Sequence, residues 1–175
     1  MNLENLKNEL PDFAKDIKLN LSSVLSETGS PDLNQKQIDS IALASAYATR
    51  NTDVIAAATA HGSAGLTAED IYAAKAAATI MAMNNVYYRF THTMSDPDYA
   101  AMPAKLRMNV MATPGMDKIL FELNSLAVSA INGCGKCMNA HAEQLEKSGT
   151  SKQAIQSAIR IASVIHAAAL AREIR

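Results

Sequence analysis

The spacing of apolar residues along the chain is helical nearly throughout. Alanine-rich segments with apolar residues three and four positions apart recur, whereas strict alternation of apolar and polar residues over the length of a strand is hard to find. No low-complexity tract and no strong internal repeat interrupts this pattern. The pattern therefore predicts an all-α protein.

Capping and breaking residues divide the first half of the chain into predicted helices. Pro11 occupies a first helical position, although it could also break a preceding short helix from Leu3. Asn51-Thr52 offers a stop followed by a cap. Thr67 and Asp70 have the spacing of a capping box. The helices are expected from Pro11 to about Val24, from Leu33 to Arg50, from Thr52 to about Gly62, and from Thr67 to just before Asp96. Their expected buried positions include Ile38, Ile41, Leu43 and Ala46, and then Ile71, Ala74, Ala78, Met81 and Val86.

The second half of the chain has sharper breaks. Asp96 to Pro103 is a turn-rich connector, and a short helix is expected between it and the break at Thr113-Pro114-Gly115. Asp117 can cap a helix, which Asn132-Gly133 then ends. The predicted helices here are Lys118 to about Ile131, Cys134 to about Ser148 before Gly149, and a terminal helix that starts at Thr150 or Ser151.

Composition and charge describe one globular domain over residues 1–175. With 49% hydrophobic and 19% charged residues, a chain of this length can bury a core without disulfides or a structural metal. Sixteen Lys plus Arg against 17 Asp plus Glu give a net charge of −1, which argues against nucleic acid as a partner. The longest apolar stretch, Ile161 to Ala171, is too short to span a membrane. No targeting segment is apparent at the start, so a cytoplasmic location is expected.

The two cysteines, Cys134 and Cys137, are the most informative residues. In a reducing compartment a close pair indicates redox or metal chemistry rather than a permanent disulfide. If a helix begins near Cys134, both sulfurs and His141 lie on one face of it. The helix N-terminus and the charge of Lys136 should then lower a cysteine pKa below its ordinary value of about 8.5.

The local pattern leaves the nucleophile open between the two sulfurs. The helix start favours Cys134, whereas His141, one turn beyond Cys137, could take the proton of that second thiol. Either cysteine could resolve a sulfenic acid formed on the other. Glu122 lies at the margin of an apolar stripe, so it could reach His141 and complete a relay, or it could remain a solvated edge residue.

Other interpretations of the cysteine pair are weaker. A structural zinc site needs four ligands, and a more distant histidine, His61, His92 or His166, would have to complete the local three. Covalent haem attachment requires a histidine at position 138, where this chain has methionine. Two inert buried thiols are the remaining alternative.

Residues outside the cysteine motif have simpler expected roles. His166 stands in an apolar run and is expected to be a hydrogen-bonded core residue. His61, beside Gly62, is expected to be a cation at a helix C-terminus. Met81 and Met83 are expected to fill the core.

Four residues carry a resemblance to a known family. Glu122, Cys134, Cys137 and His141 match the pattern E-x11-C-x-x-C-x-x-x-H. This pattern is similar to the signature of the alkyl hydroperoxide reductase AhpD family, within the carboxymuconolactone decarboxylase-like superfamily. Further stretches resemble that family as well, so the likeness covers essentially the whole chain; they include MAMNNVYYR from Met81, LRMNVMATPG from Leu106 and FELNSLAVSAINGC from Phe121.

The resemblance implies an all-helical, homotrimeric antioxidant enzyme without a bound cofactor or metal. Members of the family reduce organic hydroperoxides and regenerate the peroxiredoxin AhpC. Their electrons come from a dihydrolipoyl group on an acyltransferase protein. Two alternatives remain open, namely a non-redox carboxymuconolactone decarboxylase-like enzyme and a helical interaction module with inert thiols.

The resemblance also implies roles for individual residues. Cys137 would become the sulfenic acid, and Cys134 would be its proton donor and resolving thiol, the two forming a redox disulfide. His141 and Glu122 would form the proton relay. Lys136 departs from the best-known branch of the family, which has histidine there; lysine can support a thiolate by charge but is a poor proton shuttle at neutral pH.

Overall fold

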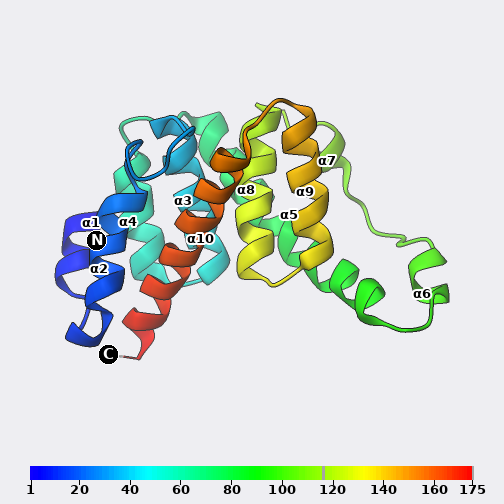
Figure 1. Ribbon diagram of the computed structural model, residues 1–175, viewed down its shortest axis with the longest axis horizontal. Helices are drawn as coiled ribbons and strands as arrows, with labels where there is room; N and C mark the ends of the chain where they lie inside the picture. Colours follow the sequence, from blue (N-terminus) through cyan, green and yellow to red (C-terminus); the bar gives the residue numbers. More distant parts are fainter. Residues whose placement is uncertain (116, 175) are drawn as a thin grey trace.

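The computed structural model describes residues 1–115 and 117–174, and these residues form helices and connecting segments without a β-strand. The predicted all-α class is therefore confirmed. The elements, in chain order (Figure 1), are α1 (Leu3–Asn8), the 3₁₀ turn η1 (Asp12–Ala14), α2 (Lys15–Val24), α3 (Gln35–Thr49), α4 (Thr52–Gly62), α5 (Ala68–Thr93), α6 (Asp98–Ala101), α7 (Asn109–Ala112), α8 (Lys118–Ile131), α9 (Gly135–Lys147) and α10 (Lys152–Glu173).

Helices α3, α8 and α10 pack against one another and form the centre of the molecule. In Figure 1, α1, α2 and α4 lie at one end of this centre, and α5 and α9 lie toward the other end. Most of the largest core side chains come from the three central helices, with Phe121, Leu126, Ile38, Ile41 and Ile161 almost fully buried. Many core positions between them are alanine, which lets the helix axes approach closely.

Most helix starts follow the predicted caps. Asn51 Oδ1 accepts a hydrogen bond from the N–H of Val54, and Asp117 Oδ1 accepts one from the N–H of Leu120. Ser151 caps α10, and the predicted capping box of Thr67 and Asp70 opens α5. Side-chain oxygens satisfy N–H groups that the helix itself leaves unpaired, so these starts are set by nearby residues.

Several local predictions were wrong. The helix expected from Pro11 begins with η1 and becomes α2 only at Lys15, and the predicted connector from Asp96 to Pro103 contains α6. Val86 is 60% exposed because the buried face of α5 in this stretch carries Met81, Asn84 and Asn85 instead. His166 is exposed because the buried face of α10 carries Ile161, Ile165 and Ala168 instead.

Helix α10 is long and apolar enough to cross a membrane by length and composition, contrary to the estimate from the sequence. An 18-residue window in it has a mean hydropathy of 1.4, but 56% of that window is buried inside the protein. The helix packs against α2, α3 and α8. Its buried Arg172 also pairs with Asp53 and Glu9, which joins its C-terminal end to α4 and to the segment after α1. Packing in the protein core therefore accounts for its apolar face.

The start of α5 is anchored by Asp70, a buried carboxylate. Its Oδ2 accepts a hydrogen bond from the N–H of Thr67 at 2.9 Å, and its Oδ1 lies 2.9 Å from Nζ of Lys36 on α3. Burial raises the pKa of Asp70, but the hydrogen bonds from Thr67 and Lys36 outweigh it and lower the pKa below its ordinary value of 3.8. The ionised carboxylate therefore holds the first turn of α5 against α3.

We expect Asp70→Asn to lower the free energy of unfolding by about 1 kcal/mol near pH 7, since Lys36 is half exposed and its charge is partly screened. A lowered native pKa stabilises the fold fully above the ordinary value, and this contribution is lost as the pH falls through the native pKa. Urea unfolding of both proteins between about pH 7 and about pH 2.5 measures the effect. A difference that does not shrink on acidification would contradict this assignment.

Candidate active site

The turn between α8 and α9 brings the predicted motif together. Gly133 has φ of 69°, a left-handed conformation that is strained for residues with a Cβ. Its N–H donates to the carbonyl of Ala130, and the N–H of Cys134 donates to the carbonyl of Ser129. The chain reverses there, as Asn132-Gly133 predicted, and α9 packs against α8.

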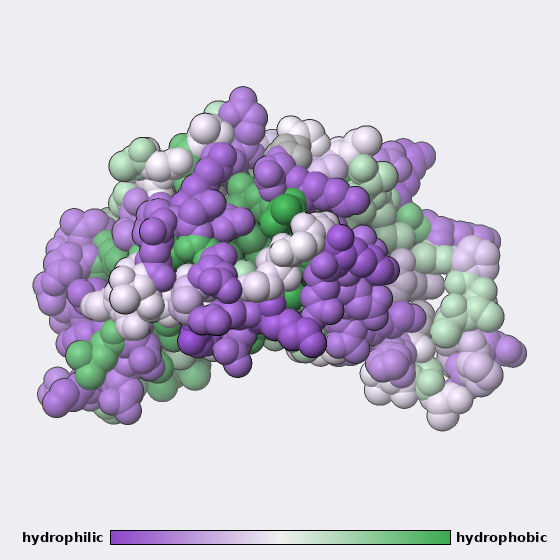
Figure 2. Space-filling model, turned by 45° about the horizontal axis from the view of Figure 1, so that its top comes forward, coloured by the Kyte–Doolittle hydropathy of each residue, from purple (hydrophilic) through white to green (hydrophobic). Residues whose placement is uncertain are grey.

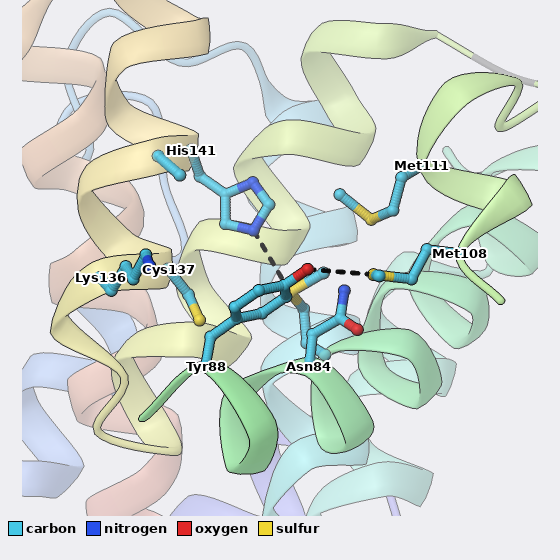
Figure 3. Close-up of a pocket in the computed structure, with 9 residues that line it drawn as sticks. Asn84, Tyr88, Met108, Met111, Lys136, Cys137 and His141 are labelled. Carbon is cyan, nitrogen blue, oxygen red and sulfur yellow. Dashed lines mark hydrogen bonds between the residues drawn. The ribbon is translucent and has the colours of Figure 1, made fainter. Parts of the chain in front are cut away.

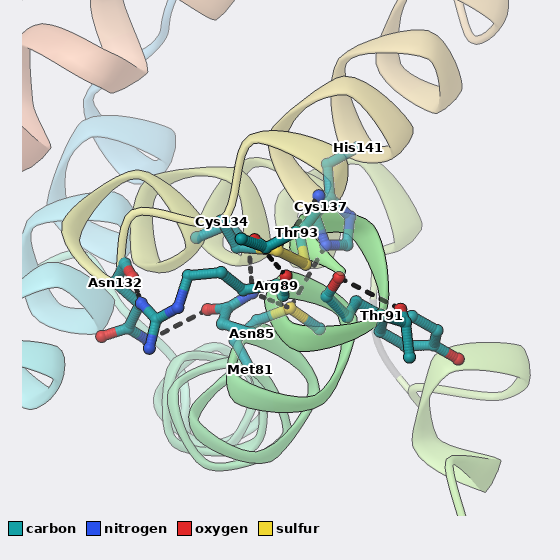
Figure 4. Close-up of a disulfide and its surroundings, with 11 residues drawn as sticks. Met81, Asn85, Arg89, Thr91, Thr93, Asn132, Cys134, Cys137 and His141 are labelled. Atoms are coloured by element: carbon teal, nitrogen blue, oxygen red, sulfur yellow. Dashed lines mark hydrogen bonds between the residues drawn. A yellow bond between two sulfur atoms is a disulfide. The ribbon is translucent and has the colours of Figure 1, made fainter. Parts of the chain in front are cut away.

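The two cysteines stand at the start of α9 and are joined in a disulfide (Figure 4). The helix begins at Gly135, one residue later than predicted, because Cys134 has an extended backbone and serves as the N-cap. Its Sγ accepts a hydrogen bond of 3.3 Å from the N–H of Cys137. An N–H of the first helical turn therefore points at sulfur, where it favours negative charge when the pair is reduced.

The two sulfurs differ in their access to a cavity. Cys134 is fully buried, whereas Cys137 is 6% exposed and lines a cavity of about 260 Å³. A small molecule that enters this cavity meets Cys137.

The sequence left open whether Glu122 reaches His141, and the structure shows that it does. Both side chains are buried, and Oε2 of Glu122 lies 2.7 Å from Nδ1 of His141. An ionised carboxylate can only accept hydrogen bonds, so this contact favours a proton on Nδ1. Glu122 thus orients the imidazole ring from α8, and the Nε2 edge faces away from it.

The Nε2 edge of His141 meets a methionine on α5. Sδ of Met81 lies 3.2 Å from Nε2 (Figure 4). The sequence predicted Met81 only as core filling, and its burial confirms that part. With the proton on Nδ1, Nε2 of neutral His141 is an acceptor, and a thioether has no proton to give it. Nε2 is therefore available to accept a proton from a thiol or a water.

A second hydrogen-bonded group fixes the α8–α9 turn to α5 (Figure 4). Asn85 donates from Nδ2 to Ser129 Oγ at 2.9 Å and accepts from Nδ2 of Asn132 at 3.0 Å. An Nη1–H of Arg89 donates to the carbonyl of Asn132 at 2.6 Å. These contacts position the residues directly before Cys134.

Lys136 is exposed at the cavity. Its Nζ lies 5.8 Å from the ring centroid of Tyr88, within the range of a cation–π contact. The predicted positive charge therefore lies at the cavity that Cys137 lines.

The walls of the cavity are mostly apolar and come from segments far apart in the chain. Met81 and Tyr88 line it from α5, and Met108 and Met111 line it from the segment at α7. The Tyr88 hydroxyl donates to Sδ of Met108 at 3.6 Å. None of these residues was predicted from the sequence to line a cavity. The signal available was helical spacing, because Met81 and Tyr88 are seven positions apart on one face.

The other histidines lie apart from the site. Nε2 of His61 is 3.4 Å from Oδ1 of Asp39, and His61 is in the last turn of α4 as predicted. Burial raises the pKa of Asp39, opposed by a hydrogen bond from Gln35 and by His61. His92 and His166 are exposed. Within residues 1–115 and 117–174, no group of three His, Cys, Asp or Glu is arranged to hold a metal ion.

Comparison with known proteins places this site in a family. A model of the carboxymuconolactone decarboxylase family matches residues 97–175. An alkyl hydroperoxide reductase AhpD from Coxiella burnetii is 56% identical over 164 residues, which cover 94% of this chain and 93% of that protein. An alkyl hydroperoxide reductase AhpD from Brucella abortus is 53% identical over 173 residues, which cover 99% and 97%. The likeness spans both the cysteine motif and the α5 residues that surround it, and the chain belongs to the alkyl hydroperoxide reductase AhpD family.

Proposed function

We propose that this protein is an alkyl hydroperoxide reductase that cycles between a dithiol and the Cys134–Cys137 disulfide. One observation carries the proposal: a buried, hydrogen-bonded Glu122–His141 pair stands with a closed cysteine pair at an apolar cavity. The names of the relatives support the same activity. Sulfur carries both electrons in this cycle, so it requires no metal, haem or flavin.

The proposed cycle begins with the reduced pair. His141 takes the proton of the Cys137 thiol, directly or through a water, and Glu122 stabilises the charged imidazole. The thiolate attacks a peroxide oxygen, the O–O bond breaks, and the products are an alcohol and a sulfenic acid on Cys137. The Cys134 thiol then attacks that sulfur, water leaves, and the disulfide forms.

Access to the cavity supports the assignment of Cys137 as the attacking sulfur. Cys137 lines the cavity, whereas Cys134 is fully buried behind the N-terminus of α9. The position of Cys134 suits a resolving thiol, since its Cα lies 5.3 Å from that of Cys137. This division of roles agrees with the one that the family resemblance implies.

The cycle needs an external dithiol to reduce the disulfide. We assign this role to the dihydrolipoyl group of a lipoylated acyltransferase protein, and we assign AhpC as the peroxiredoxin that the reduced pair regenerates. The apolar lining around Cys137 suits the hydrocarbon part of a lipoyl arm as well as that of an organic hydroperoxide. A cytoplasmic location would keep the donor reduced.

Replacing either cysteine by serine should abolish turnover of an organic hydroperoxide with dihydrolipoamide as donor, because neither variant can close the disulfide. Cys137→Ser should also stop oxidation of the remaining thiol at low peroxide, whereas Cys134→Ser should accumulate a sulfenic acid. Peptide mass spectrometry after peroxide treatment measures both outcomes. Normal turnover in either variant, or product formation that survives alkylation of both thiols, would favour a non-redox enzyme of the superfamily.

Replacing Glu122 by glutamine should slow thiol oxidation by peroxide about tenfold to a hundredfold, because the neutral amide no longer stabilises charged His141. Glu143→Gln is the matched control, since it removes an exposed carboxylate from α9, the helix that carries His141. Rapid quenching with an alkylating reagent gives the rate of thiol loss for each variant. Equal rates of thiol loss for the wild type and Glu122→Gln would contradict a role of the Glu122–His141 relay in the reaction.

We also propose that the protein is a homotrimer that buries the segment around α6. This segment stands away from the body of the molecule (Figures 1 and 2). All four residues of α6 are exposed, and the Tyr99 ring packs edge-on against Phe90 at the end of α5. Met94, Met102 and Leu106 add exposed apolar surface. Such a surface is typical of a contact between subunits.

Tyr99→Glu with Met102→Glu should dissociate the trimer, because two charges would enter the proposed contact. Leu19→Glu is the matched control, since Leu19 is 63% exposed on α2 at the other end of the molecule. Sedimentation equilibrium gives the mass of each protein. A wild-type protein that sediments at the mass of a single chain would contradict the trimer.

A further inference from the structure

Asn84 is a buried amide on the cavity face of α5. It is 4% exposed and lines the same cavity as Cys137 and His141. Its Oδ1 is buried and has no hydrogen-bond partner in the part of the chain that the structure describes. In Figure 3 the amide nitrogen points toward the space enclosed by His141, Met108 and Met111.

The next residue, Asn85, differs from Asn84 because its amide is paired with other residues of the protein. Asn85 faces the α8–α9 turn and is hydrogen-bonded to both Ser129 and Asn132. Asn84 makes no comparable contact with α8 or α9 in the described residues. Other buried polar atoms also lack a hydrogen-bond partner in the described residues, but they do not line this cavity; they belong to Ser45, His61, Asn124 and Ser125.

An unpaired amide among methionines is unfavourable for folding. Leucine has nearly the same size and would fill the position without leaving a polar atom unpaired. A ligand that hydrogen-bonds the amide removes this cost when it binds. Rotation about the last side-chain bond can turn either amide atom toward the cavity, so the residue can present a donor and an acceptor.

We propose that Asn84 binds the hydroperoxide group of the substrate and donates a hydrogen bond to the oxygen that leaves. This inference rests on the peroxidase activity proposed above. A hydroperoxide carries one O–H donor and one inner oxygen acceptor, and an amide offers the complementary pair. The alkyl group then lies against Met108, Met111 and Tyr88, which form the apolar part of the wall.

The hydrogen bond acts where charge develops in the reaction. The Cys137 thiolate attacks the terminal oxygen, a new S–O bond forms, and the O–O bond breaks with its electron pair on the inner oxygen. Sulfur is oxidised by two electrons and the peroxide is reduced. The resulting alkoxide takes the proton that His141 removed from the thiol. A donor from Asn84 stabilises that alkoxide in surroundings with few other polar groups.

The test uses the variant Asn84→Leu and measures two reactions separately: oxidation of the thiols by peroxide and reduction of the disulfide by dihydrolipoamide. The reduced protein is mixed with cumene hydroperoxide or with hydrogen peroxide, and thiol loss is followed by rapid alkylation and mass spectrometry. We expect the second-order rate constant to fall at least about tenfold with both peroxides, since the lost bond is to the O–O group rather than to the tail. Reduction of the disulfide by dihydrolipoamide should stay within about twofold of the wild type.

Asn85→Leu is the matched control for folding. It removes paired hydrogen bonds and should lower Tm by about 3 °C or more, whereas Asn84→Leu should leave Tm nearly unchanged. If Asn84→Leu does not fold, Asn84→Ala is measured in its place, because it removes the amide without adding bulk.

Each outcome bears on the inference. Slower peroxide reaction with unchanged disulfide reduction and unchanged Tm supports it. Equal rates of the peroxide reaction in Asn84→Leu and the wild type overturn it. Slower disulfide reduction alone also overturns it. So does equal slowing of both reactions together with a lowered Tm. A wild-type protein that does not lose two hydrogens to peroxide would instead overturn the proposed function itself.

Discussion

The hydrogen bond between Glu122 and His141 is the contact on which the rest of the site depends. It joins α8 to α9, two helices that meet only because the chain reverses at Gly133. Neither side chain would be buried at low cost without the other, since an unpaired carboxylate in the interior is strongly unfavourable. The pair therefore sets how α9 lies on α8, and with it the place of Cys137 one turn before His141.

Helix α5 forms the opposite side of the site, and its two adjacent asparagines have different roles. Asn85 is fully hydrogen-bonded and holds the turn before Cys134. Asn84, one residue earlier, faces the cavity and has its oxygen unpaired in the described residues. Methionines form much of the remaining wall, so the few charges and dipoles near the sulfur act in surroundings where water screens them weakly.

Much of this site could be predicted from short-range spacing. Cys137 and His141 are four residues apart on one helix, so they share a face wherever that helix packs. The cap at Asp117 and the turn at Gly133 were likewise visible, because caps and turns depend on adjacent residues. The burial of Glu122 could not be predicted, since a residue at the margin of an apolar stripe is buried or exposed according to what packs beside it. Val86 and His166 were predicted incorrectly for the same reason.

The sequence by itself determined the helices, their caps and the order of sulfur, sulfur and imidazole along the start of α9. These features depend on the helical period and on contacts within a few residues. The tertiary structure decided that Glu122 reaches His141, that Cys137 rather than Cys134 meets the cavity, and that Asn84 lines it. Those facts depend on how α5, α7, α8 and α9 pack in three dimensions, and residues that are dozens of positions apart carry no periodic signal of their contact.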